Sequence, residues 1–384
     1  MTQRLLSLMM ILLLVCGGAR AEESAGCAVT DVGLDLLGSS IHYPQLTGLD
    51  DAEVQSAVNA AIMEAGCISE RLNRMAALAN APVKLKVSYT HMLTAEVFSC
   101  AILAEGAVET SRSTQEWGTL NVDLRTGREI GFAELFSDAD AALEAIAVIL
   151  NEQIAPELSA HLAAGSLTPV PARFTLSPTG LTLYYDIDSF RTLGDRAGTV
   201  TLLWTELRTH LRLEADDVLT VIGAAEHLTL DETSAGKMAE ALSDGALPGI
   251  PAAIGQPMQT LIDRYALLND PDIYEGGRMI ALEDGAFREI WLLTDALTEH
   301  FDQSVVQGIR ADRLNFFGLC TGVTTRDQWH AALGAPQTTL TVDASRADSW
   351  RIVPGTSDYY TLGEYRLRLH ADEEGVLRTV FLTH

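Results

Sequence analysis

Residues 83–89 read Val-Lys-Leu-Lys-Val-Ser-Tyr, and this stretch marks a change in the period of the apolar residues. Apolar and polar residues alternate within it, which is the period of a β-strand with one solvated face. The apolar positions before it, Val54, Val58 and Ile62, recur every four residues after a capping pair at Asp50-Asp51. The sequence therefore predicts helices over about 50–80 that lead into a strand.

Further strands follow this one, and the turns between them favour hairpins. Leu120, Val122 and Leu124 alternate with polar residues in the same way. Residues 174–185, Phe-Thr-Leu-Ser-Pro-Thr-Gly-Leu-Thr-Leu-Tyr-Tyr, place a turn containing Pro and Gly between two apolar runs. Strands joined by hairpins, with a few helices between them, indicate an α+β domain with a mixed helix and antiparallel-sheet structure. We expect this domain over residues 22–222.

The C-terminal part is expected to form two small units. Residues 223–250 are rich in Ala, Gly and Pro and are interpreted as a linker. Within 251–384 the stretches 255–265 and 322–334 both have a glycine entry followed by a short amphipathic helix, and strand-like runs come after each. A spacing of 67 residues between their first glycines is long for a solenoid repeat. We therefore expect two tandem helix-plus-antiparallel-sheet units, about 251–318 and 319–384.

The first 21 residues have the three parts of a secretory signal peptide. Arg4 gives a positive start, residues 5–15 form an apolar run, and Ala19-Arg20-Ala21 is a small-x-small cleavage site. No later segment is long and apolar enough to span a bilayer, which takes about 20 residues. The sequence predicts export to the periplasm or the medium, and the alternative is a lipoprotein anchored through Cys16.

Four cysteines remain after cleavage, and an oxidising compartment favours one or two disulfides among them. Three of the four lie in the N-terminal half, so one bond is expected there, with the pairing left open. In that case the fourth cysteine, Cys320, is free and buried. No pair has the close spacing of a zinc or redox site, and we expect no metal. The disulfide candidates are Cys27, Cys67, Cys100 and Cys320.

The chain is strongly acidic, with 26 Lys and Arg against 52 Asp and Glu and a net charge of −26. Removal of residues 1–21 takes away Arg4 and Arg20 and no acid, so the mature chain carries −28. Nucleic-acid binding requires a basic surface, and the composition excludes that class. Two interpretations of the acidity remain: a solvated surface that keeps an exported protein soluble, or attraction towards a basic partner.

Two stretches carry a family resemblance. They are residues 121–136, Asn-Val-Asp-Leu-Arg-Thr-Gly-Arg-Glu-Ile-Gly-Phe-Ala-Glu-Leu-Phe, and the hairpin of 174–185 followed by 198–207. The N-terminal half resembles the extracytoplasmic domain of the lysozyme-sensing anti-sigma-V factors, which is also an accessory module of peptidoglycan deacetylases. The C-terminal half, through Leu333-Gly-Ala-Pro336 and its helix-plus-sheet pattern, resembles the tandem fold of the β-lactamase-inhibitor protein. The resemblance implies lysozyme or another muramidase as a partner.

Motifs of catalysis are missing from the sequence. It contains no Gly-x-Ser-x-Gly nucleophile elbow, no phosphate-binding loop and no His-Glu-x-x-His zinc motif, so no cofactor is expected. Asp186 and Asp188 are the carboxylates considered for an undetected hydrolytic site. An aromatic binding face on the tandem units is the candidate site, and the alternative is that its members fill two small cores. These members are Trp291, Trp329, Tyr359 and Tyr360.

These features predict an exported, non-enzymatic binding protein of the bacterial cell envelope. A basic muramidase such as lysozyme, or another envelope protein, is the expected partner, because an acidic surface accelerates encounter with a basic one. Two alternatives stay open: an enzyme acting on cell-wall glycan, and an inhibitor of a secreted or periplasmic enzyme that acts through the C-terminal tandem units.

Overall fold

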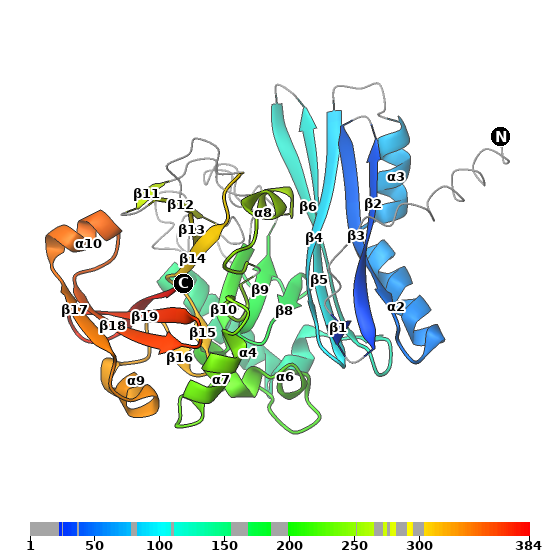
Figure 1. Cartoon of the computed structure of the whole chain (residues 1–384). Coiled ribbons are helices and arrows are strands. Elements are labelled where there is room, and N and C mark those ends of the chain that lie inside the picture. Colours follow the sequence, from blue (N-terminus) through cyan, green and yellow to red (C-terminus); the bar gives the residue numbers. More distant parts are fainter. Residues whose placement is uncertain are drawn as a thin grey trace, which may run out of the picture. The chain divides into compact units, whose positions relative to one another are not determined.

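A computed structural model of the chain describes most of the residues after position 22 (Figure 1). The chain divides into two compact units, Met1–Gly131 and Phe132–His384. Both combine helices with antiparallel sheets, so the predicted α+β class is confirmed. The described residues are 23–24, 26–36, 38–77, 83–108, 111–154, 168–185, 199–250, 252–264, 272–274, 277–281, 290–294 and 303–384.

The first unit is built on a seven-stranded sheet whose strands follow one another in chain order. Neighbouring strands are antiparallel except β3 and β4, which are parallel. The long strand β4 contains the alternating stretch at 83–89, and β6 contains the stretch that begins at Leu120 as far as Asp123, as predicted. The strands are β1 (Glu23–Ser24), β2 (Cys27–Leu36), β3 (Ser39–Thr47), β4 (Val83–Leu93), β5 (Val97–Val108), β6 (Ser111–Asp123) and β7 (Arg128–Glu129).

Two helices, α2 (Ala52–Ala65) and α3 (Ile68–Ala77), connect the parallel strands β3 and β4 and cover one face of the sheet (Figure 1). Parallel neighbouring strands run in the same direction, so the chain must return along the sheet between them, and a tight turn is too short for this. Asp51 caps α2 by accepting hydrogen bonds from the backbone N–H groups of the first turn. Val58 and Ile62 are fully buried against the sheet, so the helix predicted from their spacing is confirmed.

The second unit begins with short helices and a three-stranded antiparallel sheet. The hairpin predicted at 174–185 is confirmed as β8 and β9, with the Ser177 hydroxyl accepting from the backbone N–H of Gly180 across the turn. The third strand, β10, pairs with β9. The elements are η1 (Phe132–Leu135), α4 (Ala139–Val148), η2 (Ile149–Ile154), β8 (Phe174–Leu176), β9 (Gly180–Tyr184), β10 (Thr199–Leu203), η4 (Trp204–Leu207), α6 (Val218–Val221), η5 (Ala224–His227), α7 (Ser234–Ala241) and α8 (Met258–Arg264).

An eight-stranded antiparallel sheet forms the rest of the second unit, in the order β11-β12-β13-β14-β20-β19-β18-β17. A two-stranded ribbon, β15-β16, and the helices α9 and α10 accompany it. The elements are β11 (Asp272–Tyr274), β12 (Gly277–Ala281), β13 (Ile290–Thr294), β14 (Val306–Ala311), β15 (Asn315–Phe316), β16 (Leu319–Cys320), α9 (Arg326–Leu333), β17 (Thr338–Val342), α10 (Ala344–Trp350), β18 (Gly355–Leu362), β19 (Tyr365–Asp372) and β20 (Leu377–Thr383).

The eight-stranded sheet joins strands from both of the predicted tandem units. β14, in the first, pairs with β20, in the second, so the two stretches share one sheet. Met238 and Leu242, from the segment interpreted as a linker, are fully buried in the core of this sheet. The boundaries expected at 22–222, 223–250 and 251–384 stay predictions, whereas the compact units of the structure meet at Gly131.

The expected N-terminal disulfide is not present, because all four cysteines are free thiols. Cys27 and Cys100 are buried on β2 and β5, which two other strands separate. At about 4.8 Å between neighbouring strands the two cysteines are some 14 Å apart, beyond the reach of a disulfide. Burial raises the pKa of the Cys100 thiol to about 12. Cys67 is exposed, and Cys320 lies buried in the second unit, as expected of it.

No helix among the described residues has the length and apolar character needed to cross a membrane.

Candidate functional site

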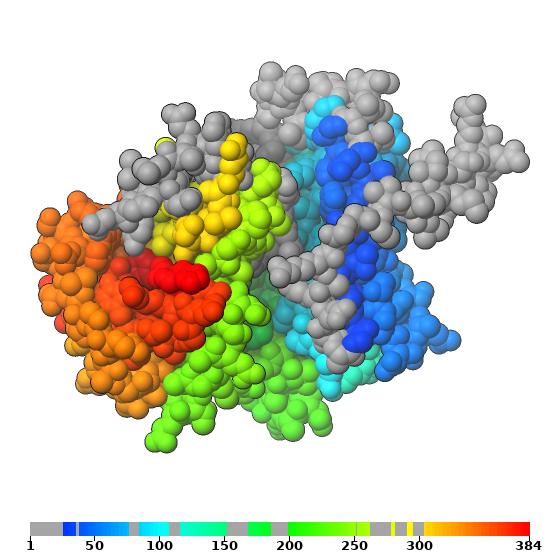
Figure 2. All heavy atoms as spheres, viewed as in Figure 1, coloured from blue at the N-terminus to red at the C-terminus, as the bar shows by residue number. Residues whose placement is uncertain are grey.

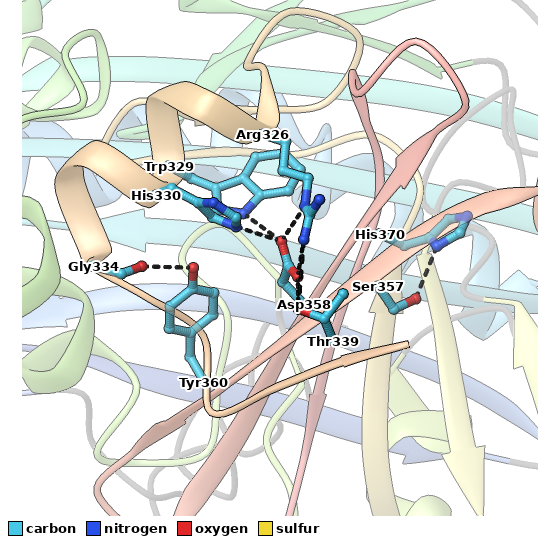
Figure 3. A network of polar contacts seen from close by, with 9 residues as sticks. All are labelled: Arg326, Trp329, His330, Gly334, Thr339, Ser357, Asp358, Tyr360 and His370. Atoms are coloured by element: carbon cyan, nitrogen blue, oxygen red, sulfur yellow. Dashed lines mark hydrogen bonds and ion pairs between the residues drawn. The ribbon is translucent and has the colours of Figure 1, made fainter. Parts of the chain in front are cut away.

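A network of polar side chains joins helix α9 to the edge strand β17 and its neighbour β18 (Figure 3). Arg326, Trp329 and His330 occupy positions i, i+3 and i+4 of α9, so they lie on the same face of the helix. The helix begins at Thr325, whose backbone N–H and hydroxyl both donate to Oε1 of Gln328 in the first turn. The three side chains point from the same face of the helix towards β18 (Figure 3).

The centre of the network is the carboxylate of Asp358, which is fully buried on β18. Arg326 donates to both oxygens, from Nε to Oδ2 at 2.7 Å and from Nη2 to Oδ1 at 2.9 Å. Trp329 Nε1 lies 3.2 Å and His330 Nε2 2.7 Å from Oδ2. The Thr339 hydroxyl on β17 donates to Oδ1 at 2.6 Å. Each carboxylate oxygen therefore has at least two donors.

These donors keep Asp358 ionised. Burial by itself raises the pKa of the carboxyl, but the hydrogen bonds from Arg326, Thr339 and His330 outweigh burial and hold the pKa at about 2. A group with this pKa carries its charge at any physiological pH, so it cannot exchange a proton with a substrate at a useful rate. Asp358 is a fixed anion that orients its neighbours.

His330 is the member of the network that reaches solvent, with 30% of its side chain exposed. An ionised carboxylate only accepts hydrogen bonds, so Nε2 of His330 carries the proton that Asp358 accepts. The other ring nitrogen, Nδ1, points away from this hydrogen bond. This geometry is that of an imidazole oriented by a buried carboxylate.

The far end of α9 is attached to the same strand. Tyr360 lies two residues after Asp358 on β18 and therefore points to the same face of the sheet. Its hydroxyl donates to the carbonyl of Gly334 at 3.1 Å, just beyond the last turn of the helix (Figure 3). Together with Asp358 this bond holds α9 against the sheet at both ends.

The opposite face of the sheet carries a second pair of polar groups, Ser357 on β18 and His370 on β19. The Ser357 hydroxyl lies 2.9 Å from His370 Nδ1, and His370 Nε2 lies 2.8 Å from the carbonyl of Val353. Because that carbonyl accepts the Nε2 proton, Nδ1 accepts from serine, as in a nucleophile and base pair. Burial lowers the pKa of His370 to about 4. Both side chains are fully buried, so no substrate can reach the hydroxyl.

An alternating row of aromatic and arginine side chains crosses the same face of the sheet. Its members are directly opposite one another on five adjacent strands. The guanidinium of Arg368 lies 4.5 Å from the Phe381 ring and 4.2 Å from the ring of Trp350 on α10. Such stacking stabilises a buried guanidinium through the negative ring faces. The arginine–aromatic row consists of Trp291, Arg310, Phe381, Arg368 and Tyr359.

The four aromatic residues expected to form one binding face are divided between the two faces of the sheet. Trp329 is fully buried and Tyr360 is 4% exposed, both on the side of α9. Trp291 and the half-buried Tyr359 belong to the arginine–aromatic row on the other side. Adjacent strand residues such as Tyr359 and Tyr360 point in opposite directions, so no single face contains all four.

Two residues of the network, Trp329 and Tyr360, were expected as binding residues, whereas its other members were not identified from the sequence. These other members are Arg326, His330, Thr339 and Asp358. Arg326 and Asp358 are 32 positions apart, and only the pairing of β17 with β18 brings them together. The helical spacing of Arg326, Trp329 and His330 was the one available signal. Asp186 and Asp188 lie outside the described residues. Among the described residues, no group of three or more His, Cys, Asp or Glu could hold a metal ion.

Comparison with known proteins gives matches only among solved structures: no protein-family model and no curated protein matches the chain. A DUF3298-family structure from Bacteroides fragilis is 12% identical, with a TM-score of 0.35, over 52% of this chain and 99% of its own length. A DUF3298-family protein from Pseudomonas aeruginosa is 10% identical, with a TM-score of 0.34, over 51% of this chain and 96% of its own.

A third solved structure, a DUF4309-family protein from Bacillus subtilis, is 14% identical, with a TM-score of 0.25, over 40% of this chain and 97% of its own. All three are described as members of families whose function is not known. The similarity to domains of unknown function is therefore found at the level of these structures. The resemblances to the anti-sigma-V domain and to the β-lactamase-inhibitor protein stay predictions.

Proposed function

We propose that this chain is an exported, non-enzymatic binding protein of the cell envelope, periplasmic or secreted, that captures a basic protein partner. Lysozyme or another muramidase is the most concrete partner. The observation that carries the proposal is the charge of the surface: among the described residues three arginines and three aspartates are buried, so the large excess of acidic side chains remains exposed to solvent. The signal peptide expected at residues 1–21 supports export.

The buried cations are arginines engaged within the fold. Arg310 and Arg368 are 5% and 6% exposed in the arginine–aromatic row, and Arg71 is 9% exposed in the first unit. Arg310 donates from Nε and Nη2 to the Asp312 carboxylate at 2.9 and 2.8 Å. These cations contribute little to the surface potential. The solvent-facing surface is consequently more anionic than a uniform distribution of the same residues would make it.

Acidic side chains are concentrated in the segment from 214 to 244, which holds eight acids and one lysine. Seven of the eight acidic side chains are exposed. The segment includes α6, η5 and α7 and lies on the face of the protein seen in Figure 2, in green. An anionic surface of this kind accelerates association with a cationic protein and opposes association with anionic ones.

The polar groups on β18 support a binding role over catalysis. The carboxylate of Asp358 stays charged, and the Ser357–His370 pair is closed to solvent. Both sets of hydrogen bonds instead attach α9 and the loop before β18 to the sheet. A rigid support of this kind suits a surface that binds without changing its ligand.

The proposal is tested by measuring the binding of residues 22–384 to lysozyme at ~0.15 M salt, where the Debye length is about 8 Å. A similarly basic protein without muramidase activity is the control. Binding to lysozyme at least tenfold tighter than to the control supports recognition of a muramidase. Equal binding to both reduces the proposal to charge attraction, and no binding to either contradicts it.

A second candidate function, an enzyme acting on cell-wall glycan, is favoured by one observation, the partly exposed imidazole of His330 held by Asp358. Turnover of purified peptidoglycan that disappears in His330→Ala would support it. The matched control is Asp327→Asn, which changes an exposed neighbour on the same helix. Absence of turnover in the unaltered protein, or turnover that survives His330→Ala, excludes this role for His330.

A further inference from the structure

Asn315 is a fully buried amide in the ribbon between β14 and α9, and the functional proposal makes no use of it. It lies on β15 directly opposite Cys320 on β16. The two strands are joined by a tight turn at Phe317 and Gly318, whose φ angles are 45° and 81°. Opposite residues of an antiparallel pair project from the same face with Cβ atoms about 5 Å apart, so the amide lies beside the thiol.

The side-chain amide of Asn315 is not satisfied by the described residues. Among the described residues neither Oδ1 nor Nδ2 of Asn315 has a hydrogen-bond partner. An exchange of the two atoms by rotation of the amide would not help, because both lack partners. Folded proteins leave very few buried polar groups unbonded, and a side chain with two such atoms requires an explanation. Asn121, buried in the first unit, shows the ordinary case, since its Oδ1 accepts from Ser99 at 2.7 Å.

Polar groups surround this position on the side of η4. The Thr205 hydroxyl lies 3.0 Å from the Cys320 sulfur. The next residue, Glu206, accepts from Arg313 Nη2 at 2.8 and 2.6 Å. The side chains of Arg313 and Glu206 are 19% and 15% exposed, so polar groups continue from the buried amide to the surface. The Cys320–Thr205 pair therefore places polar atoms beside the buried amide.

The two unpartnered atoms of Asn315 define the chemistry of a molecule that satisfies them. Because Oδ1 needs a donor and Nδ2 needs an acceptor, this molecule must both donate and accept a hydrogen bond. We propose that Asn315 holds an ordered internal water molecule, which bridges its amide to the Cys320–Thr205 pair and thereby ties the β15–β16 ribbon to η4. Water satisfies both requirements, and a buried water commonly has two to four such partners.

The direct test is a crystal structure of the full mature chain. The expected result is one solvent peak about 2.7–3.2 Å from both Oδ1 and Nδ2 of Asn315. In solution, the side-chain amide protons of Asn315 should show a cross-relaxation signal to water. A dry site in the crystal together with no water signal in solution overturns the proposal.

A substitution gives an independent readout. Asn315→Leu keeps the branching at Cγ, is larger than asparagine and needs no hydrogen bonds. If the amide were unbonded, its removal would raise the urea midpoint of the second unit; if water satisfies it, the midpoint stays the same or falls. Asn121→Leu is the matched control, expected to lower the midpoint of the first unit because it removes an amide with a protein partner. A raised midpoint for Asn315→Leu contradicts the bound water.

Discussion

Replacement of Asp358 by asparagine removes the charge at the centre of the α9–β18 network and keeps the size of the side chain. The carboxylate accepts from Arg326, Trp329, His330 and Thr339 on its two oxygens. An amide offers only one oxygen, and its NH₂ group meets donors in the place of the other. Arg326 also loses its counter-charge. The variant should therefore be destabilised by several effects at once.

The size of this loss follows from the pKa. A carboxyl whose pKa is held at about 2, below its ordinary value of 3.8, is stabilised in its charged form by about 2.5 kcal/mol. Removal of one partner from a fully buried pair costs about 3–5 kcal/mol, but Arg326 and His330 are each about one third exposed, which lowers that figure. We expect Asp358→Asn to lower the free energy of unfolding of the second unit by about 2–4 kcal/mol.

Urea denaturation followed by tryptophan fluorescence and far-UV circular dichroism measures this change. Thr339→Val is the graded control, because it removes one of the hydrogen bonds to Asp358 and should cost about 1 kcal/mol. A free energy of unfolding for Asp358→Asn within ~0.5 kcal/mol of the unaltered protein would refute the network as a stabilising element.

The same shift predicts a pH dependence. The pKa of Asp358 is lower in the folded state than in the unfolded chain, so its contribution is complete above about pH 4. That contribution is lost as the pH falls towards about 2. The difference in stability between the unaltered protein and Asp358→Asn should therefore shrink over this range, while a difference that is constant down to pH 2 would contradict the assigned pKa.

Two further predictions concern the first unit. A hydrogen bond to Asp31 raises the pKa of His42, so its contribution to stability is present below pH ~6.5 and is lost as the pH rises through the raised value. Gly33→Ala would place Cβ 2.5 Å from the His42 ring, and NMR titration should show the pKa returning towards its ordinary value; an unchanged pKa would contradict the contact. Gly118→Ala would place Cβ 1.9 Å from the carbonyl oxygen of Ala65, and thermal unfolding should show a loss of about 2–3 kcal/mol; an unchanged midpoint would contradict that close approach.

Elements defined by local periodicity could be predicted from the sequence. The helix α2 follows from the spacing of Val58 and Ile62 and from its capping pair, and the β8–β9 hairpin follows from its turn residues. Both depend on residues within about a dozen positions of one another, where the spacing of apolar side chains directly reflects the geometry. The α+β class follows from the sum of such elements.

Features that depend on distant pairing could not be predicted. The registers β14–β20 and β17–β18 decide that one sheet contains both C-terminal stretches and that Asp358 meets α9. No local pattern contains that information. The opposite directions of Tyr359 and Tyr360, by contrast, follow from their adjacency once the segment is assigned to a strand. The absence of an N-terminal disulfide could not be predicted for the same reason, because the spacing of the cysteines in the sequence does not show that two strands lie between Cys27 and Cys100.

The proposed capture of a basic partner by the acidic surface is tested by two charge-matched triple variants. Asp216→Asn, Glu232→Gln and Glu240→Gln remove three exposed charges from the 214–244 segment. The control removes three exposed charges from helices α2 and α3 at Glu53, Glu64 and Glu70.

The affinity of each variant for lysozyme is measured by isothermal titration calorimetry at ~0.15 M salt, where charges beyond about 8 Å are screened. We predict that the 214–244 variant binds lysozyme at least tenfold more weakly than the unaltered protein does, while the affinity of the α2–α3 variant stays within about twofold of it. Equal affinities for all three proteins would contradict it.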